Sequence, residues 1–565
     1  MTYQIRKAVT AALMAGTAIG SGTAMAIDMT TVPATNVLYA GGSTAVSASL
    51  AQYFVQSGDP ASEPCDQNQP IDYYTDSAGN TQFLAVACAS GTAMTGLALD
   101  TPIAFMKELN GGSFNGLGPV GAASALTFPT TTELTSNAYE TGATACVSTA
   151  IAPVVVNSTT IAIGYTSHSC SSSANFPTDT AAYTAVSLAP NMGFADVDPA
   201  TFGTSTTALG ITTGQTLDLP FAPAVSLGLY HALQAAEGLP QDDLLVDMPS
   251  LTKDELSSIY TGQATLWTTF IGTNGTSVGA QSVLFGASSG SEYGGSSTAT
   301  TPSSAGIYLC RRDNYSGTER INELYYGGQN CELGVDPFRA ALSYSGSNIT
   351  FGNSWTTSAD SAAATFAASS TGNLLSCLEG HDTVGHFAIG YASVDNAWGG
   401  QNSQKSSRDD WRFIKVDGIV PSIENVAAGK YPVYAQSVYA VPSSTSAANY
   451  ATGAALTIQQ FMTTISASQP TGFGKAATVA AVNALDVWHN PDFDGGAVAI
   501  PTAGFNTPSP ATASLATFQS NPVSLFVKST GTTLNNCQVP VKTSISTTTL
   551  GTGGITTWQA SQRSN

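Results

Sequence analysis

The chain has 565 residues, of which 17 are Lys or Arg and 37 are Asp or Glu, so its formal net charge is -20. This sign excludes nucleic-acid binding through a basic face, because a phosphate backbone requires positive charge opposite it. Apolar residues make up 42% of the chain, which excludes a disordered acidic protein. The length allows about three domains, or two large lobes with insertions.

Residues 1–26 have the pattern of a cleavable secretory signal peptide. Arg6 and Lys7 precede an apolar run, and residues 24–26 read Ala-Met-Ala, a small-residue ending typical of a cleavage site. No cysteine follows directly, so a lipid anchor is not expected, and no later apolar stretch is long enough to span a bilayer. We therefore expect a mature chain that begins at Ile27 and is periplasmic or secreted.

After the signal, a predicted strand at 37–40 runs into a Gly-Gly-Ser-Thr turn and then a helix marked by Val46, Leu50 and Phe54. Residues 57–100 and 120–190 are Ser/Thr/Gly-rich insertions, irregular or β-rich. A strand at 219–225 leads into a helix that extends to about residue 236. Thr252 and Glu255 form a capping box for the next helix, which Gly262 ends.

The strand–turn–helix order then repeats at 307–310, 311–317 and 318–326. Further strands are predicted at 386–392 and 431–441, and further helices at 452–466 and 475–487. This alternation predicts an α/β protein with parallel sheets. The end of the chain, 541–565, is predicted to be a flexible tail.

The eight cysteines suit an exported protein, because an even number outside the cytoplasm usually forms disulfides. No two are spaced as Cys-x-x-Cys, so a zinc knuckle is not expected. Proximity in the sequence favours these pairs among many alternatives: Cys65 with Cys88, Cys146 with Cys170, Cys310 with Cys331, and Cys377 with Cys537.

The turns at 41–44 and 311–317 could each hold an oxyanion. Both lie between a strand and a helix, where backbone N–H groups and hydroxyls meet the positive end of a helix dipole. The second turn also carries Arg312, whose fork of donors matches a tetrahedral oxyanion. For either turn alone, simple helix capping by Ser43 or Ser316 is the alternative explanation.

In this order the segments resemble the phosphate-binding proteins of bacterial phosphate importers, within the periplasmic binding protein superfamily. Residues 40–45, Ala-Gly-Gly-Ser-Thr-Ala, look like the first phosphate loop of that family, and residues 311–318 look like its Arg-x-Asp-Gly-Ser-Gly-Thr loop. Ile-Tyr-Thr-Gly at 259–262, ahead of Trp267, and Ala-Ile-Gly-Tyr at 388–391 match further family segments. The resemblance implies a two-lobed type II fold with long insertions. Lobe 1 would comprise residues 27–222 and 436–540, and lobe 2 residues 223–435, with crossing segments near 218–226 and 431–442.

The resemblance also implies a ligand set drawn from both lobes: Thr44, Ala45, Ser113, Asp196, Arg312, Ser316, Gly317 and Thr318. Asp198 is the competing choice for the acidic position. A carboxylate there would accept a hydrogen bond from protonated phosphate and repel sulfate, which is fully ionised.

The second loop departs from the family pattern at three positions. Asn314 stands where the family has Asp, Tyr315 stands where it has Gly, and Glu319 adds a carboxylate in the first helical turn. Glu319 would form a capping box with Ser316. Glu319→Gln is expected to raise anion affinity, because it removes a negative charge near the site.

We therefore expect a binding protein, not an enzyme, without a cofactor or metal. The resemblance implies phosphate or a related oxyanion as ligand and an ABC importer permease as partner. The Gly-x-Ser-x-Gly pattern at 286–290 and the neighbours His381 and His386 are weak indications of a hydrolase and of a metal site. The main alternative is a secreted structural or matrix protein, because the low charge and the Ser/Thr/Gly-rich insertions also suit a scaffold.

Overall fold

The computed structural model describes the chain in segments between residues 29 and 542. They are residues 29–47, 50, 54, 64–66, 68–76, 83–109, 111–131, 134, 146–151, 154–156, 159–162, 165–170, 185–242, 245–285, 299–328, 337–338, 365–368, 370–394, 411–422, 425–426, 429–467, 498–499, 526–527, 529–530, 533–534, 536–537 and 541–542. The signal peptide, the pattern at 286–290, the helix predicted at 475–487 and most of the tail lie outside these residues.

Among the described residues, more lie in strands than in α-helices. They are β1 Val37–Gly42, β2 Asp72–Asp76, β3 Phe83–Ala89, β4 Pro102–Glu108, β5 Leu126–Pro129, β6 Cys146–Ile151, β7 Val154–Val156, β8 Thr159–Ala162, β9 Tyr165–Cys170, β10 Ala185–Leu188, β11 Met192–Ala195, β12 Ile211–Ser226, β13 Ser250–Leu251, β14 Ser304–Arg312, β15 Thr365–Ala368, β16 His386–Ser393, β17 Trp411–Phe413, β18 Lys415–Val416, β19 Tyr434–Pro442, β20 Val498–Ala499, β21 Phe526–Val527, β22 Ser529–Thr530, β23 Thr533–Leu534 and β24 Val541–Lys542. The two insertions are therefore β-rich.

The described α-helices are α3 Gly118–Ala122, α4 Thr206–Leu209, α5 Leu227–Glu237, α6 Lys253–Tyr260, α7 Gly317–Tyr326, α8 Thr371–Thr383 and α10 Gly453–Ala467. The capping box of α6 is confirmed, since the Thr252 hydroxyl accepts from the Glu255 N–H and the Glu255 carboxylate accepts from the Thr252 N–H. None of the helices among the described residues combines the length and apolarity needed to cross a membrane.

One 14-stranded sheet organises the molecule, with the path β15-β14-β16-β12-β19-β11-β1-β4-β3-β2-β9-β6 and with β17 and β20 paired to β12 beside this path. The α/β prediction is confirmed, but the expectation of parallel sheets is wrong. β1 is parallel to β4 and β11, and β14 is parallel to β15 and β16, whereas β12 is antiparallel to both β16 and β19. β12 and β19 join the two parallel groups through antiparallel pairs, and β3 and β6 are also antiparallel to their neighbours, so the sheet as a whole is mixed.

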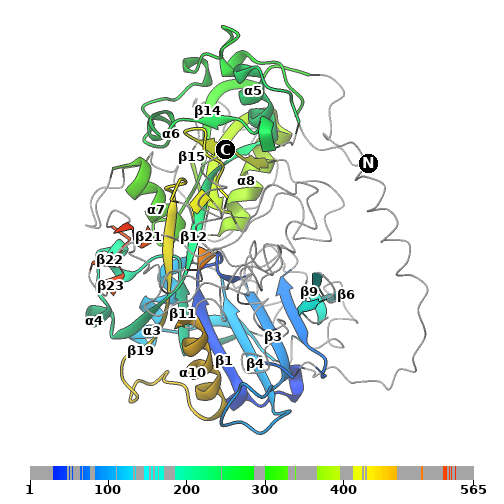
Figure 1. Ribbon diagram of the computed structural model, residues 1–565, viewed down its shortest axis with the longest axis vertical. Coiled ribbons are helices and arrows are strands. Elements are labelled where there is room, and N and C mark those ends of the chain that lie inside the picture. The colour runs from blue at the N-terminus through cyan, green and yellow to red at the C-terminus, as the bar shows by residue number, and fades with distance from the viewer. Residues whose placement is uncertain are drawn as a thin grey trace, which may run out of the picture.

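The long strand β12 joins two halves of the sheet. Its first part, to Pro220, pairs with β19, and its second part, from Phe221, pairs with β16. Figure 1 shows α5, α6, α7 and α8 grouped with β14 and β15 at one end, and β1, β3 and β4 with α10 at the other. We call these the α8 half and the β1 half. The crossing lies within the predicted segments, while the exact lobe boundaries stay a prediction.

A hydrophobic core runs through both halves. One continuous buried cluster includes Leu38 and Phe194 in the β1 half and Trp267, Tyr391 and Trp411 in the α8 half. Burial of side chains of this size contributes about 1.5 to 3 kcal/mol each relative to exposure. The core therefore supports the strand ends at which the two halves meet.

Two disulfides are defined among the described residues. Cys65 bonds Cys88, as predicted, but Cys310 bonds Cys377, so the predicted pairs Cys310–Cys331 and Cys377–Cys537 are both wrong. Cys310 lies within β14 and Cys377 within α8, and α8 packs on β14. A strand residue thus bonds the helix that covers it, which sequence proximity could not indicate. Cys537 is also disulfide-bonded.

The remaining predicted pair is Cys146 with Cys170. These residues lie directly opposite each other in the antiparallel pairing of β6 with β9. The bond itself stays a prediction.

Candidate anion-binding site

The first predicted turn follows β1 and passes close to β11. Gly42 has φ 111°, and a Cβ at this position would lie 2.0 Å from the Phe194 carbonyl oxygen, so only glycine fits. The Ser43 N–H donates to that same carbonyl at 2.9 Å. The Ala45 N–H, a predicted ligand group, donates to the Ser43 hydroxyl at 3.1 Å. This N–H therefore already has a partner within the turn.

Asp196, directly after β11, is the acidic centre of the site. Its carboxylate accepts hydrogen bonds from the hydroxyls of Ser43 and Ser113, the latter at 2.9 Å, and its N–H donates to the Ser113 hydroxyl at 3.1 Å. Burial raises the pKa of Asp196, while the two hydroxyl bonds and the charges of Arg312 and Lys107 lower it. The charge of Arg312, a residue of the α8 half, therefore acts on the Asp196 carboxylate.

The competing residue Asp198 has a structural role. It caps the 3-10 helix Pro199–Phe202 by accepting from the Ala200 N–H at 3.0 Å. It also accepts from the backbone N–H and the side-chain amide of Asn536, at 2.9 and 2.8 Å. Of the two candidates, only Asp196 contacts other predicted site residues.

Arg312, the last residue of β14, is buried at 2% exposure. Its Nη1 donates to the Thr371 hydroxyl at 2.7 Å and its Nε donates to the Ala368 carbonyl at 3.2 Å. Burial lowers the pKa of Arg312, and the nearby carboxylates, Asp196 among them, raise it. A guanidinium pKa lies so far above neutrality that the group stays charged.

Thr371 links the two halves and was not predicted. It is the first residue of α8, and its hydroxyl lies 3.1 Å from the hydroxyl of Thr44 in the first turn. Ser370 caps this helix by accepting from the Asn373 N–H at 3.2 Å. The Ser-Thr pair ahead of Leu374 and Leu378 is a helix-start signal that could have located α8.

The helix α7 begins against Asp196. A Cβ at Gly317 would lie 2.5 Å from the Ser113 hydroxyl and 2.8 Å from the Asp196 Cβ, so glycine allows this contact. Ser316 caps α7 by accepting from the Glu319 N–H at 3.4 Å, and Thr318 is buried. The N-terminus of α7 thus faces the acidic centre.

Two hydrogen bonds, one between backbone groups and one from a side chain, hold the halves together beside the site. The Phe114 N–H donates to the Tyr315 carbonyl at 3.1 Å, and the Arg320 Nε donates to the Thr201 carbonyl at 3.1 Å. The rings of Phe114 and Tyr315 also lie 5.6 Å apart. All eight predicted residues therefore lie in one connected region formed by both halves.

The predicted capping box of Ser316 and Glu319 is only half present. The Glu319 carboxylate accepts from the Arg312 N–H at 2.9 Å and from the Tyr391 hydroxyl, and it pairs with the Arg311 guanidinium at 2.5 Å. Glu319 is fully buried. Its charge is balanced by Arg311, so it is not the isolated negative charge that the sequence suggested.

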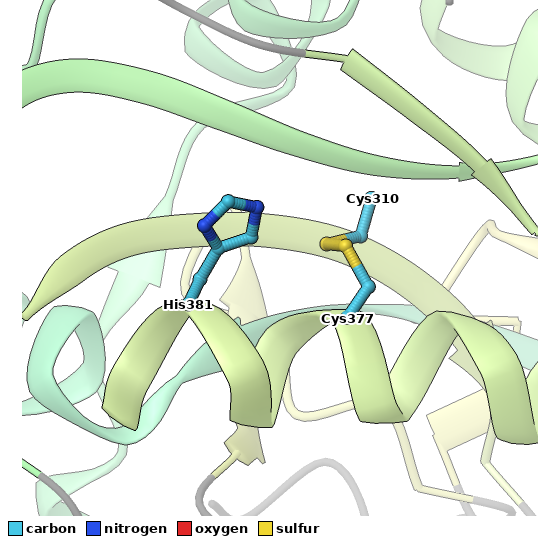
Figure 2. Close-up of side chains that lie close together, drawn as sticks. All are labelled: Cys310, Cys377 and His381. Carbon is cyan, nitrogen blue, oxygen red and sulfur yellow. A yellow bond between two sulfur atoms is a disulfide. The ribbon is translucent and has the colours of Figure 1, made fainter. Parts of the chain in front are cut away.

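Cys310, Cys377 and His381 form a compact group with metal-ligand chemistry (Figure 2). The two sulfur atoms are bonded to each other, however, and a disulfide offers no thiolate to a metal ion. The Nδ1 atoms of His381, in α8, and His386, in β16, lie 3.2 Å apart across the turn between these elements. Burial and the neighbouring His386 lower the pKa of His381 to about 3, which keeps its imidazole neutral.

No family model matches this chain, and no curated protein matches it. Among solved structures, it is similar to a phosphate ABC transporter substrate-binding protein with bound phosphate from Clostridium perfringens, with a TM-score of 0.29, 15% identity, 52% of this chain and 77% of that chain covered. An ABC-type phosphate transport receptor from Vibrio cholerae has a TM-score of 0.26 and 14% identity, covering 52% and 79%. PstS from Borrelia burgdorferi has a TM-score of 0.24 and 13% identity, covering 52% and 78%. At these values the likeness carries no argument about the ligand, for which the site geometry is the basis.

Proposed function

We propose that this protein is an exported solute-binding protein that holds an oxyanion, inorganic phosphate first, between its two halves. The observation that carries the proposal is the chain of contacts from Thr44 through Thr371 to Arg312. It joins a hydroxyl of the β1 half to a buried guanidinium of the α8 half. An anion that replaces the direct hydroxyl contacts would bind both halves at once.

The groups gathered here suit a tetrahedral oxyanion. The hydroxyls of Ser43, Thr44, Ser113 and Thr371 can rotate from one another toward an anion, since each carries one donor and two lone pairs. The helices α7 and α8 both begin here, and their N-termini favour negative charge. Arg312 adds a full positive charge in a buried place, where charge-assisted hydrogen bonds are strongest.

Asp196 gives the reason to choose phosphate over sulfate. A carboxylate accepts a hydrogen bond from protonated phosphate, whereas sulfate has no proton to offer and is repelled. The carboxylate is fully enclosed, at 3% exposure, so solvent does not weaken this repulsion. We propose that an ABC importer permease receives the bound phosphate.

Thermal unfolding of the mature protein with phosphate, sulfate, a phosphonate and an organic phosphate tests the function. Ligand at one hundred times its Kd stabilises the folded state by about 2.7 kcal/mol. We expect the largest shift with phosphate and none with chloride at equal ionic strength. Equal shifts of the unfolding temperature with every anion, chloride included, would favour the structural or matrix role instead.

A further inference from the structure

A buried lysine lies directly beneath the first turn. Lys107 is on β4 and is fully buried. Its ammonium donates to the Gly42 carbonyl at 3.2 Å, to the Ser43 carbonyl and to the Ser47 hydroxyl at 3.2 Å. An ammonium has three N–H donors, and here two have acceptors in the turn and the third has one in Ser47, in the helical segment that follows.

These contacts orient the peptide units of the turn. In a trans peptide the carbonyl and the following N–H point in opposite directions. Because the Ser43 carbonyl faces Lys107, the Thr44 N–H must point away from it. The preceding N–H, that of Ser43, donates to Phe194. Lys107 thus holds the turn from one side. The Thr44 N–H points away from Lys107, and the Thr44 hydroxyl lies near that of Thr371.

Lys107 is also the second positive charge of the site. The charged groups that act on it are Glu108, its neighbour on β4, and Asp196, which Arg312 also influences. Lys107 adds one positive charge to an environment that also holds Arg312, Asp196 and Glu108. Without Lys107, this environment would be more negative by one charge and would attract a doubly charged anion less strongly.

We infer that Lys107 is a positioning residue of this site, which orients the first turn and makes the site favour hydrogen phosphate, the dianion, over singly charged dihydrogen phosphate. This inference rests on the proposed function. Burial lowers the pKa of Lys107 to about 7, while the charges of Glu108 and Asp196 act in the opposite direction. A bound dianion favours the ammonium, so binding is accompanied by proton uptake at pH values above this pKa.

Titration calorimetry of phosphate binding to the parent and to Lys107→Gln, from about pH 6.5 to about pH 9, tests the inference. Glutamine keeps hydrogen-bond donors but removes the charge. At the low end we expect the variant to bind about tenfold more weakly or worse. The ratio should shrink as pH rises, because the parent then loses the same charge. A ratio that is constant with pH would mean a merely structural role and overturn the inference.

Lys253→Gln on α6 is the matched control. It removes one positive charge from a lysine that lies over the Tyr325 ring, and we expect unchanged phosphate affinity at every pH. If Lys107→Gln does not fold, the parent alone decides the question. Calorimetry in buffers of different ionisation enthalpy at about pH 8.5, where phosphate is already the dianion, counts protons taken up. Uptake supports the inference, and none overturns it.

Failure of the inference and failure of the proposed function are distinguishable. If the parent binds no phosphate at any pH, the proposed function itself is wrong. If the parent binds phosphate and neither the pH-dependent ratio nor proton uptake is found, only the role of Lys107 is wrong.

Discussion

Arg312 places one full positive charge of the site on a buried side chain with defined partners. Arg312→Ala is expected to leave the anion's charge unmatched and to cost about 2 to 5 kcal/mol of phosphate binding, a loss of about thirtyfold or more. Calorimetric titration measures this loss of phosphate affinity. Arg312→Lys, which keeps the charge without the fork of donors, should retain part of the affinity. Unchanged binding in Arg312→Ala would place the site elsewhere.

Asp196 is expected to set the choice between phosphate and sulfate. In Asp196→Asn the amide can donate a hydrogen bond, so the repulsion of sulfate disappears. We expect the ratio of phosphate to sulfate affinity to fall by about tenfold or more. Asp198→Asn is the control, because Asp198 caps a 3-10 helix and should not change the ratio. An equal change in both variants would remove Asp196 from its proposed role.

The structure reverses the expectation for Glu319. Its carboxylate is buried against Arg311 and accepts from the Tyr391 hydroxyl, so Glu319→Gln leaves a buried guanidinium without its charge partner. Breaking such a pair costs about 3 kcal/mol or more of unfolding free energy. Urea unfolding measures this loss. Glu255→Gln, at the exposed capping box of α6, should cost about 1 kcal/mol or less. A gain in anion affinity without loss of stability would restore the original expectation.

At the scale of elements, the disulfide Cys310–Cys377 ties β14 to α8, and these two elements supply Arg312 and Thr371. Replacing both cysteines by serine is expected to cost about 4 kcal/mol of unfolding free energy, because the bond closes a loop of 67 residues. The same change at Cys65 and Cys88, separated by 23 residues, should cost about 3 kcal/mol. Denaturant unfolding compares the two variants. Non-reducing peptide mapping that finds Cys310 bonded to Cys331 would contradict the arrangement.

Sequence patterns predicted elements best where polar and apolar residues alternate with the regular period of a helix or a strand. The capping box and apolar face of α6 are of this kind. β12 is longer than the predicted 219–225, because its first half, from Ile211, has many polar residues that pair with β19 without an alternating pattern. α8 was missed since its helix-start signal lies in a Ser/Thr-rich context. The pairing of β12 with β19 and the packing of α8 on β14 and β16, which the sequence does not display, defined these two elements.

At the scale of the whole molecule, the export prediction concerns the chain before Met29, the first described residue. We expect cleavage after Ala26, because the Ala-Met-Ala ending presents small residues to signal peptidase. Mass spectrometry of the exported protein measures the N-terminus. Ala24→Leu, which removes one small residue, should slow processing. A secreted protein that keeps residues 1–26 would contradict the prediction.

The sequence by itself determined the α/β class, the capped helices and the two strand–turn–helix units that carry Thr44 and Arg312. Each of these depends on neighbours within a few positions of the chain, which a linear pattern records. Even a resemblance that named eight site residues could not separate Asp196 from Asp198, since both lie in one short acidic stretch.

Only the tertiary structure decided which residues act together. It selected Asp196 by bringing Ser113 and Gly317 against it, and it added Thr371 and Lys107. It also gave Glu319 a partner and Cys310 its true bond. The physical reason is common to all of them. Buried charges, hydroxyls and thiols find their partners across strands and helices distant in the sequence, and burial makes those partners matter energetically.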